Sequence, residues 1–481
     1  MFLITLTIKI IFCYYFFRIF AILMGGSKKS SELLELIRYG KPMTNSQKLN
    51  LIYQLSIPSI LAQITSVMMF FIDQAMVGRI SVEAAAACGL VESSTWLCGS
   101  MTSAASMGFS VQVAHFIGAN DFSKARAVFR HALLCTFIFS MVVGCTGLLI
   151  SRQLPFWLGG GDDIASDATI YFGIFMLVMP FFQLSNLSGA MLKCSGNMRI
   201  PSMMSIAMCV MDVTFNFIFI FVFHLGVLGV AMGTGLAIII GGCVQAYYAI
   251  CRSEILSLYR VAEKFSFCWD YLRNALKIGA PMAVQSILMS GAQIVSTMIV
   301  APLGNISIAA NTFAITAESL CYMPGYGIGE AATTLIGQSM GASRLDLCKS
   351  FARMSVYSGM IVMALMGAVM YVLAPELMAL MSPVQEIIDL GASVLRIEAF
   401  AEPMFAASIV CYSVFVGAGD TLKPAVMNLG SMWLVRLTLA ALLAKDYGLR
   451  GVWTAMAIEL IFRGVIFLWR MFSGKWMKSM K

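Results

Sequence analysis

Long apolar runs constrain the fold of this 481-residue chain more than any other feature. Runs of about 20 or more mostly apolar residues recur, and each could cross the roughly 30 Å hydrocarbon core of a bilayer as a helix. Only 12% of the residues are charged and the mean hydropathy is +0.85, whereas soluble domains carry roughly 25% charged residues. The period-two alternation typical of an outer-membrane barrel is not seen. The sequence therefore predicts an all-α polytopic membrane protein.

The apolar runs predict twelve transmembrane helices after residue 50. Their expected limits are 51–77, 84–116, 129–150, 165–192, 201–223, 225–251, 274–301, 306–340, 351–374, 388–416, 424–445 and 449–471.

Basic residues are unequally divided between the two sets of loops. The loops on the side of the N-terminal segment and the chain end hold 23 Lys and Arg residues, and the opposite loops hold four. Such a bias places both ends of the twelve-helix body in the cytoplasm of a multi-pass protein of the plasma (inner) membrane. The net charge of +8 follows from these loops, so nucleic acid is not expected as a partner.

Repeated residues indicate that the chain arose by an internal duplication. Pro58, Gly118, Pro180 and Pro201 each have an identical residue 223 positions later, at Pro281, Gly341, Pro403 and Pro424. Six helices, an even number, separate the copies, so both have the same topology and are related by an axis along the membrane normal. The predicted parts are an N-terminal extension (1–45), an N-terminal six-helix lobe (46–252), a cytoplasmic linker (253–270) and a C-terminal six-helix lobe (271–481). Residues 1–24 are apolar but contain Lys9 and Arg18, and are interpreted as a spurious or peripheral extension.

Several classes of function lack their motifs. No G-x-x-x-x-G-K-[ST] phosphate loop is present, so direct use of ATP is not expected. No catalytic arrangement of Ser, His and Asp is recognisable, which argues against a membrane enzyme. The three histidines have no metal-ligand spacing, and no cofactor is expected. Two lobes with a cleft between them predict a secondary transporter that alternates access by rocking.

Several motifs together carry a family resemblance over about residues 45–475. They are "PSILAQ…FFIDQAMVGRIS", "QVAHFIGAND", "LIGQSMGAS", "LKCSGNMRIP", "VGAGDTLKP" and "RGVWTAMAIE". With these motifs the chain resembles the multidrug and toxic compound extrusion (MATE) transporters of bacterial type. The resemblance implies a V-shaped pair of six-helix lobes. It also implies efflux of amphipathic, often cationic, small molecules by antiport with H⁺ or Na⁺, and we expect a functional monomer in the lipid bilayer.

Asp73 stands alone in the apolar run "FFIDQAMVG". An ionised carboxylate at a helix centre costs at least about 2.5–3.5 kcal/mol on insertion scales, so such residues mark cavities, ion pairs or cation sites. The resemblance implies that Asp73 serves the cation site of the N-terminal lobe. The alternative is a helix-end aspartate at the membrane interface.

Asp212 and Asn216 are four residues apart in the predicted fifth helix, so they share one face. We expect both to join Asp73 in a cation-coupling site that could hold Na⁺. Many members of the family carry the amide first and the acid second, and the reversed order here moves the carboxylate by about one turn, roughly 5.4 Å. A purely structural hydrogen-bonded pair is the alternative.

Four glutamates form the predicted second site, for a cation or for substrate, in the C-terminal lobe and cleft: Glu318, Glu330, Glu398 and Glu402. Glu398 and Glu402 are one turn apart and oppose joint ionisation. Some MATE branches also place a glutamate in the seventh helix, where this chain has "AVQSILMSGAQ" without an acid. For Glu318 and for Glu92, two roles remain open. Each could attract a cationic cargo, or each could form a structural pair with another side chain. Glu459 and Arg463, four apart with the acid first, are interpreted as a structural pair.

A second hypothesis stays open, because the wider superfamily includes flippases for lipid-linked sugars and other polar lipids. A flippase is expected to expose a cationic cavity to phosphate head groups, whereas the intramembrane charges here are mainly acidic.

Overall fold

The structure is a computed structural model that describes residues 27–259 and 266–478. Its described residues form helices and no strand. The predicted extension 1–24 lies outside them. The N-terminal half contains α2 (Ser27–Arg38), α3 (Asn45–Val77), α4 (Val82–Gly118), α5 (Phe122–Ile150), α6 (Leu154–Trp157), α7 (Asp162–Cys194), α8 (Arg199–Phe217) with η1 (Ile218–Val222), and α9 (Gly226–Tyr247) with η2 (Tyr248–Arg252).

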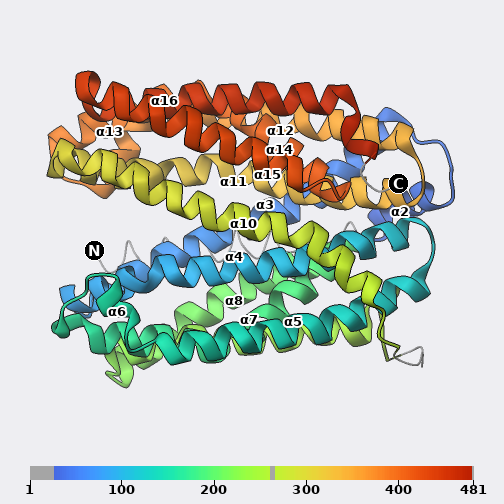
Figure 1. Ribbon diagram of the computed structural model, residues 1–481, viewed down its shortest axis with the longest axis horizontal. Helices are drawn as coiled ribbons and strands as arrows, with labels where there is room; N and C mark the ends of the chain where they lie inside the picture. Colours follow the sequence, from blue (N-terminus) through green and yellow to red (C-terminus); the bar gives the residue numbers. More distant parts are fainter. Residues whose placement is uncertain (1–26, 260–265, 479–481) are drawn as a thin grey trace.

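The C-terminal half repeats this order. It contains α10 (Trp269–Val300) with η3 (Ala301–Leu303), α11 (Asn305–Gly341), α12 (Leu345–Met381), α13 (Gln385–Ala399), α14 (Glu402–Gly417), α15 (Leu422–Gly430), η4 (Ser431–Arg436), α16 (Leu437–Ser473) and η5 (Lys475–Lys478). Figure 1 shows the two halves as two lobes, blue to green below and yellow to red above. Below, the N lobe means α3–α9 and the C lobe α10–α16.

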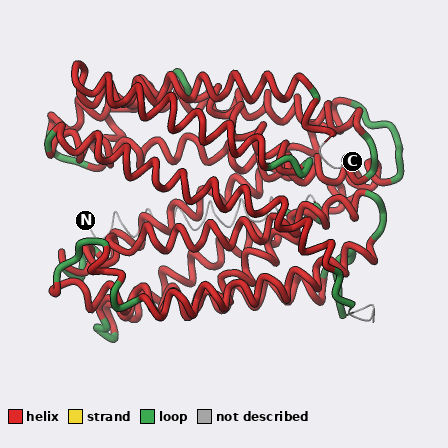
Figure 2. The backbone as a smooth tube through the Cα atoms, in the orientation of Figure 1, coloured by secondary structure: helices red, strands yellow, loops and turns green. Residues whose placement is uncertain are grey.

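Every predicted span coincides with helical structure, although not always with one helix. In the described part of the chain, eight helical runs are long and apolar enough to cross a membrane, or nine if the bent pair α13 and α14 counts as one span. One of the eight, Leu422–Ser473, covers two predicted spans and is kinked at Gly448 (φ 59°, ψ −139°). Helices α4 and α11 coincide with the spans 84–116 and 306–340. Most loops gather at the two ends of the bundle (Figure 2). The chain is a multi-pass membrane protein with an all-helical, two-lobe fold.

Local signals set the start of α3. Thr44 Oγ1 accepts a hydrogen bond from the backbone N–H of Gln47 at 3.3 Å, and Gln47 Oε1 accepts one from the N–H of Thr44 at 2.9 Å. This capping box satisfies two backbone donors that have no partner within the helix. The capping box of Thr44 and Gln47 therefore fixes the start of α3 at Asn45.

The lobes meet through a pseudo-twofold contact that uses repeat-related residues. The ring Nε2 of His115 in α4 lies 2.8 Å from the carbonyl oxygen of Gly417, and Nε2 of Gln338 in α11 donates to the carbonyl oxygen of Cys194 at 2.9 Å. His115 and Gln338, like Cys194 and Gly417, are 223 residues apart. The duplication found in the sequence is thus also present in the packing of the two lobes.

Two glycines permit this contact. A Cβ atom at Gly118 would lie 2.0 Å from the carbonyl oxygen of Gln338, and one at Gly341 would lie 1.9 Å from that of His115. Only glycine lets the two helices approach so closely. We call this end of the molecule, which includes residues 112–118 and 334–341, the joined end. It lies at the right in Figure 1, near α2 and the C-terminus, and carries the loops rich in Lys and Arg.

Candidate functional site

Three side chains from two helices form the candidate site of the N lobe. Asn216 of α8 donates from Nδ2 to Oδ1 of Asp73 in α3 at 3.1 Å. Asp212 lies one turn before Asn216 on α8, close to Asp73 and to Thr234 of α9. The structure thus brings together the three residues that the sequence predicted as neighbours, although 139 residues separate Asp73 from Asp212.

The site is buried and carries unbalanced negative charge. Asp212 and Asn216 are fully buried, and neither carboxylate oxygen of Asp212 has a hydrogen-bond partner of good geometry among the described residues. Within the same part of the chain, no basic side chain forms an ion pair with Asp73 or Asp212. A buried carboxylate without a partner is costly, so the arrangement suits a bound proton or a small cation. Carboxylate and amide oxygens are suitable ligands for a hard cation such as Na⁺.

Helix α9 closes this site from one side. A Cβ atom at Gly233 would lie 2.1 Å from Oδ1 of Asn216 and 2.9 Å from its backbone nitrogen. The contact sets the position of Asn216, and through it the hydrogen bond to Asp73. Neither Gly233 nor Thr234 was predicted as part of the site, because the sequence pattern does not show which face of α9 meets α8.

The C lobe contains a separate cluster of buried charged groups. Glu318 of α11 and Glu398 of α13 are buried near Arg436 of η4, and Glu402 of α14 is buried near both glutamates. Neither carboxylate oxygen of Glu398 or of Glu402 has a hydrogen-bond partner of good geometry among the described residues, although the Cys321 thiol lies near Glu402. This cluster includes three of the four predicted glutamates. Arg436 was missed, although a lone arginine inside an apolar span is itself a signal.

The backbone around Glu398 and Glu402 differs from the single helix that was predicted. Helix α13 ends at Ala399 and α14 begins at Glu402, and the two are bent by 58°. Pro403 lies in the first turn of α14, where its missing N–H costs nothing. The two glutamates remain neighbours, but across a break rather than along one helical face. Arg396, two residues before Glu398 on α13, donates from Nε to the carbonyl oxygen of Tyr371.

Glu459 and Arg463 form the predicted structural pair. Arg463 donates from Nε and Nη2 to the two carboxylate oxygens of Glu459, each at 2.8 Å, and Ser431 of η4 also donates to Glu459. Segment η4, which carries Ser431 and Arg436, is a π-helix, a form that often occurs at functional sites. The pair is bidentate and buried, so Arg463 is neutralised within its own helix.

Glu330 does not join the other predicted glutamates. It lies 12 residues beyond Glu318 on α11, roughly 18 Å along the helix axis. Its Oε1 is 2.7 Å from Nζ of Lys193 in α7 and 3.1 Å from Nε2 of Gln63 in α3. Glu330 therefore bridges the C lobe to the N lobe near the joined end, which the sequence did not predict.

A cavity of about 310 Å³ lies between the lobes, within the lower range of small-molecule pockets. Its lining combines aromatic rings, hydroxyl groups, amides and thioethers, and Arg463 is the only charged side chain among the described lining residues. The lining residues are Ser100, Ser103, Ala104, Met282, Gln285, Ser286, Met289, Tyr326, Phe405, Ser408, Ile409, Tyr412, Asn428 and Arg463.

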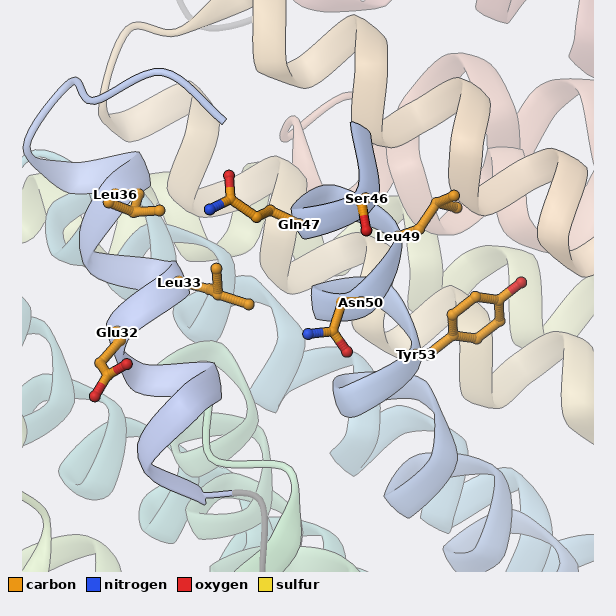
Figure 3. Close-up of a pocket in the computed structure, with 8 residues that line it drawn as sticks. All are labelled: Glu32, Leu33, Leu36, Ser46, Gln47, Leu49, Asn50 and Tyr53. Atoms are coloured by element: carbon orange, nitrogen blue, oxygen red, sulfur yellow. The ribbon is translucent and has the colours of Figure 1, made fainter. Parts of the chain in front are cut away.

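A second cavity, of about 740 Å³, lies between α2 and the first turns of α3. Figure 3 shows Leu33 and Leu36 of α2 directed toward the side of α3 that carries Gln47 and Asn50, with Glu32 on the outer side of α2. It lies outside the two carboxylate clusters, at the end that carries the basic loops. Its size alone does not make it the functional site.

Comparison with known proteins agrees with this architecture. The sequence model of the MatE family matches residues 58–218 and 281–442, once in each lobe. The chain is 24% identical over 432 residues to a probable multidrug resistance protein NorM of Thermotoga maritima, covering 88% of this chain and 92% of that protein. It is 27% identical over 440 residues to a probable multidrug resistance protein NorM of Pseudomonas aeruginosa, covering 85% and 86%.

Solved structures share the fold. A MOP superfamily transporter from Pyrococcus furiosus superposes with a TM-score of 0.85 at 20% identity, covering 93% of this chain and 98% of that one. A multidrug resistance MATE family transporter in an outward-facing conformation superposes with a TM-score of 0.84 at 21% identity, covering 92% and 98%. Two family matches in two lobes, together spanning most of the chain, show that this protein belongs to the MatE family of MATE transporters.

Proposed function

We propose that the protein exports amphipathic, cationic small molecules by antiport with H⁺ or Na⁺, through alternating access of the cleft between its lobes. It acts as a monomer in the plasma (inner) membrane, with the joined end toward the cytoplasm, and needs no cofactor. The observation that carries the proposal is the buried, unpaired carboxylate site of Asp73, Asp212 and Asn216.

The N-lobe site supports ion coupling for an electrostatic reason. Two carboxylates without a basic partner repel each other in a low-dielectric interior. A proton or a Na⁺ ion bound between them removes this repulsion, so occupancy changes the preferred distance between α3 and α8. Helix α3 also contacts the C lobe, where Gln63 donates to Glu330. A shift of α3 therefore changes the contacts between the two lobes.

The driving force is adequate for efflux. One elementary charge moving down about 150 mV releases roughly 3.5 kcal/mol, which supports a gradient of about 300-fold for a neutral cargo. A monovalent cationic cargo exchanged for one H⁺ moves no net charge, so only the pH gradient drives that exchange.

Asp73→Asn tests the proposal. Everted vesicles that contain equal amounts of wild-type or variant protein receive a fluorescent organic cation, with H⁺ and Na⁺ gradients imposed separately. We expect the wild type to concentrate the cation with one of the gradients, and Asp73→Asn to insert normally without concentrating it. Normal gradient-driven transport by Asp73→Asn would show that Asp73 has only a structural role, as the acceptor of the hydrogen bond from Asn216.

A flippase for a lipid-linked or other polar lipid is the second candidate, and the position of Arg463 in the cavity lining favours it. A cationic wall would suit a phosphate head group. Against it, Glu459 already neutralises Arg463 through two hydrogen bonds. Head-group flipping assays in the same vesicles separate the candidates, since a flippase moves labelled lipid and leaves the fluorescent cation where it was.

A further inference from the structure

The faces of α3 and α4 that contact the C lobe continue beyond the region of contact. On α3, Ile60 packs against Gly327 and Gln63 donates to Glu330. Continuing at helical spacing along this face leads through Val67 to Phe70 and Gln74. These two residues therefore lie on the face of α3 that makes the C-lobe contacts, farther from the joined end.

On helix α4, too, the face that contacts the C lobe continues beyond the region of contact. Ala104 packs against Gly279 of the C lobe, and Ser100 lines the cavity. One turn farther along the same face stands Trp96, and Glu92 lies a further turn away on the flank that meets α3. The hydrogen bond from Gln74 Nε2 to Glu92 Oε2, at 3.3 Å, joins the two helices at this level.

Four side chains thus form one surface, which we call the aromatic–acid site: Phe70, Gln74, Glu92 and Trp96. Trp96 donates from Nε1 to Oε1 of Glu92 at 3.2 Å. The Phe70 and Trp96 rings lie edge to face, with centroids 6.3 Å apart. Trp96 is 64% exposed, so most of its ring is free to contact another molecule.

The charge of this surface is not balanced locally. In the described ranges, Glu92 accepts hydrogen bonds from two neutral donors and forms no ion pair. Gln74 and Trp96 orient the carboxylate without neutralising it. A carboxylate held beside an exposed tryptophan face combines the two groups that attract an organic cation, and tryptophan is the best aromatic partner for a cation.

We propose that the aromatic–acid site binds the cationic head of an amphipathic organic ammonium or phosphonium ion on the side of the cavity away from the joined end. The inference rests on the proposed export of such cations and assigns their recognition to particular residues. The carboxylate of Glu92 supplies charge attraction, and the rings of Trp96 and Phe70 cover the apolar groups around the charged centre. An interfacial tryptophan that only anchors α4 in the bilayer would also be exposed, but it would show no preference for a cation.

The test measures equilibrium binding to purified full-length protein in detergent, without a gradient. The probes are radiolabelled tetraphenylphosphonium and neutral triphenylphosphine oxide, which is similar in its aromatic groups but carries no net charge. We expect Glu92→Gln and Trp96→Ala each to weaken tetraphenylphosphonium binding by about tenfold. Glu92→Gln should leave the affinity for triphenylphosphine oxide within about twofold, because only the charge is removed.

Matched variants outside the site serve as controls. Glu83→Gln removes an exposed carboxylate from the first turn of α4, and Trp157→Ala removes a tryptophan that is 66% exposed in α6. Both should bind tetraphenylphosphonium like the wild type. The inference would be overturned if Glu92→Gln bound tetraphenylphosphonium with the wild-type affinity. It would also be overturned if Glu92→Gln lost affinity equally for tetraphenylphosphonium and triphenylphosphine oxide. Gradient-driven efflux by the wild type, measured in vesicles, separates this failure from failure of the proposed function.

Discussion

Nζ of Lys193 in the N lobe lies 2.7 Å from Oε1 of Glu330 in the C lobe. The two side chains come from α7 and α11, and Gln63 of α3 donates to the same carboxylate oxygen. Nearby, Thr334 Oγ1 donates to the backbone carbonyl of Lys193 at 3.1 Å. These contacts exist only while the lobes are together at the joined end, so they favour the present conformation over one in which this end is open.

Removing the charge of Glu330 should loosen the joined end. The paired side chains are about a quarter exposed (27% for Lys193 and 26% for Glu330), so the ion pair contributes about 1 kcal/mol at most. Glu330→Gln should therefore raise the population with an open joined end by roughly fivefold. Hydrogen–deuterium exchange of residues 334–341 measures this change as faster exchange.

The charge-exchanged double variant is the control for that prediction. Lys193→Glu with Glu330→Lys restores opposite charges and should return the exchange rates toward those of the wild type. Asp121→Asn, which breaks the Asp121–Lys124 ion pair within the N lobe, should leave residues 334–341 unaffected. If Glu330→Gln exchanges at the wild-type rate, the pair does not hold the lobes together.

A methyl group at the pseudo-twofold contact should act more strongly than loss of the ion pair. In Gly118→Ala and Gly341→Ala the new Cβ would overlap a backbone carbonyl of the other lobe at 2.0 and 1.9 Å. Backbone cannot move aside as a side chain can, so the helices must separate. We expect faster exchange at the joined end and a loss of vesicle transport, because one of the two alternating states is disfavoured.

Gly89→Ala on the same helix α4 is the matched control, since nothing lies within 4 Å of its Cβ position. It should transport normally. Wild-type transport by both Gly118→Ala and Gly341→Ala would show that the joined end need not close as tightly as in this structure.

Ion coupling should depend on Asp212 more than on Glu402. Arg436 lies near Glu318 and Glu398 and offsets part of the charge of the C-lobe cluster to which Glu402 belongs, whereas no described basic group pairs with Asp212. Asp212→Asn should abolish gradient-driven efflux in vesicles, and Glu402→Gln should retain a substantial part of it. The opposite result, with full efflux in Asp212→Asn and none in Glu402→Gln, would locate the coupling site in the C lobe.

Gly233→Ala should disrupt the N-lobe site without touching a charged group. The added Cβ would lie 2.1 Å from Oδ1 of Asn216, and overpacking of this kind typically costs about 1–3 kcal/mol. We expect a lower thermal unfolding midpoint and weaker ion coupling than in Gly173→Ala, where nothing lies within 4 Å of the new Cβ. Equal midpoints and equal transport in the two variants would contradict the close packing of α9 on Asn216.

The tertiary structure changed the interpretation of particular charged residues more than it changed the fold. Glu330 was grouped with Glu318 by residue type, but the packing of the lobes pairs it with Lys193. Glu398 and Glu402 were expected on one helical face, but a bend separates their helices. Arg436 was not predicted, yet it lies among the C-lobe glutamates.

The sequence by itself determined the all-helical membrane fold, the duplication and the choice of Asp73, Asp212 and Asn216 as neighbours. These depend on local properties: the length of apolar runs, the spacing of repeated residues and the cost of a charge in an apolar environment. Only the tertiary structure decided which distant side chains meet. Each residue turns its side chain by about 100° around a helix axis, so a contact between helices depends on rotations and bends that no local pattern specifies. The ion pair between Lys193 and Glu330 and the contact of Gly233 with Asn216 are of this kind.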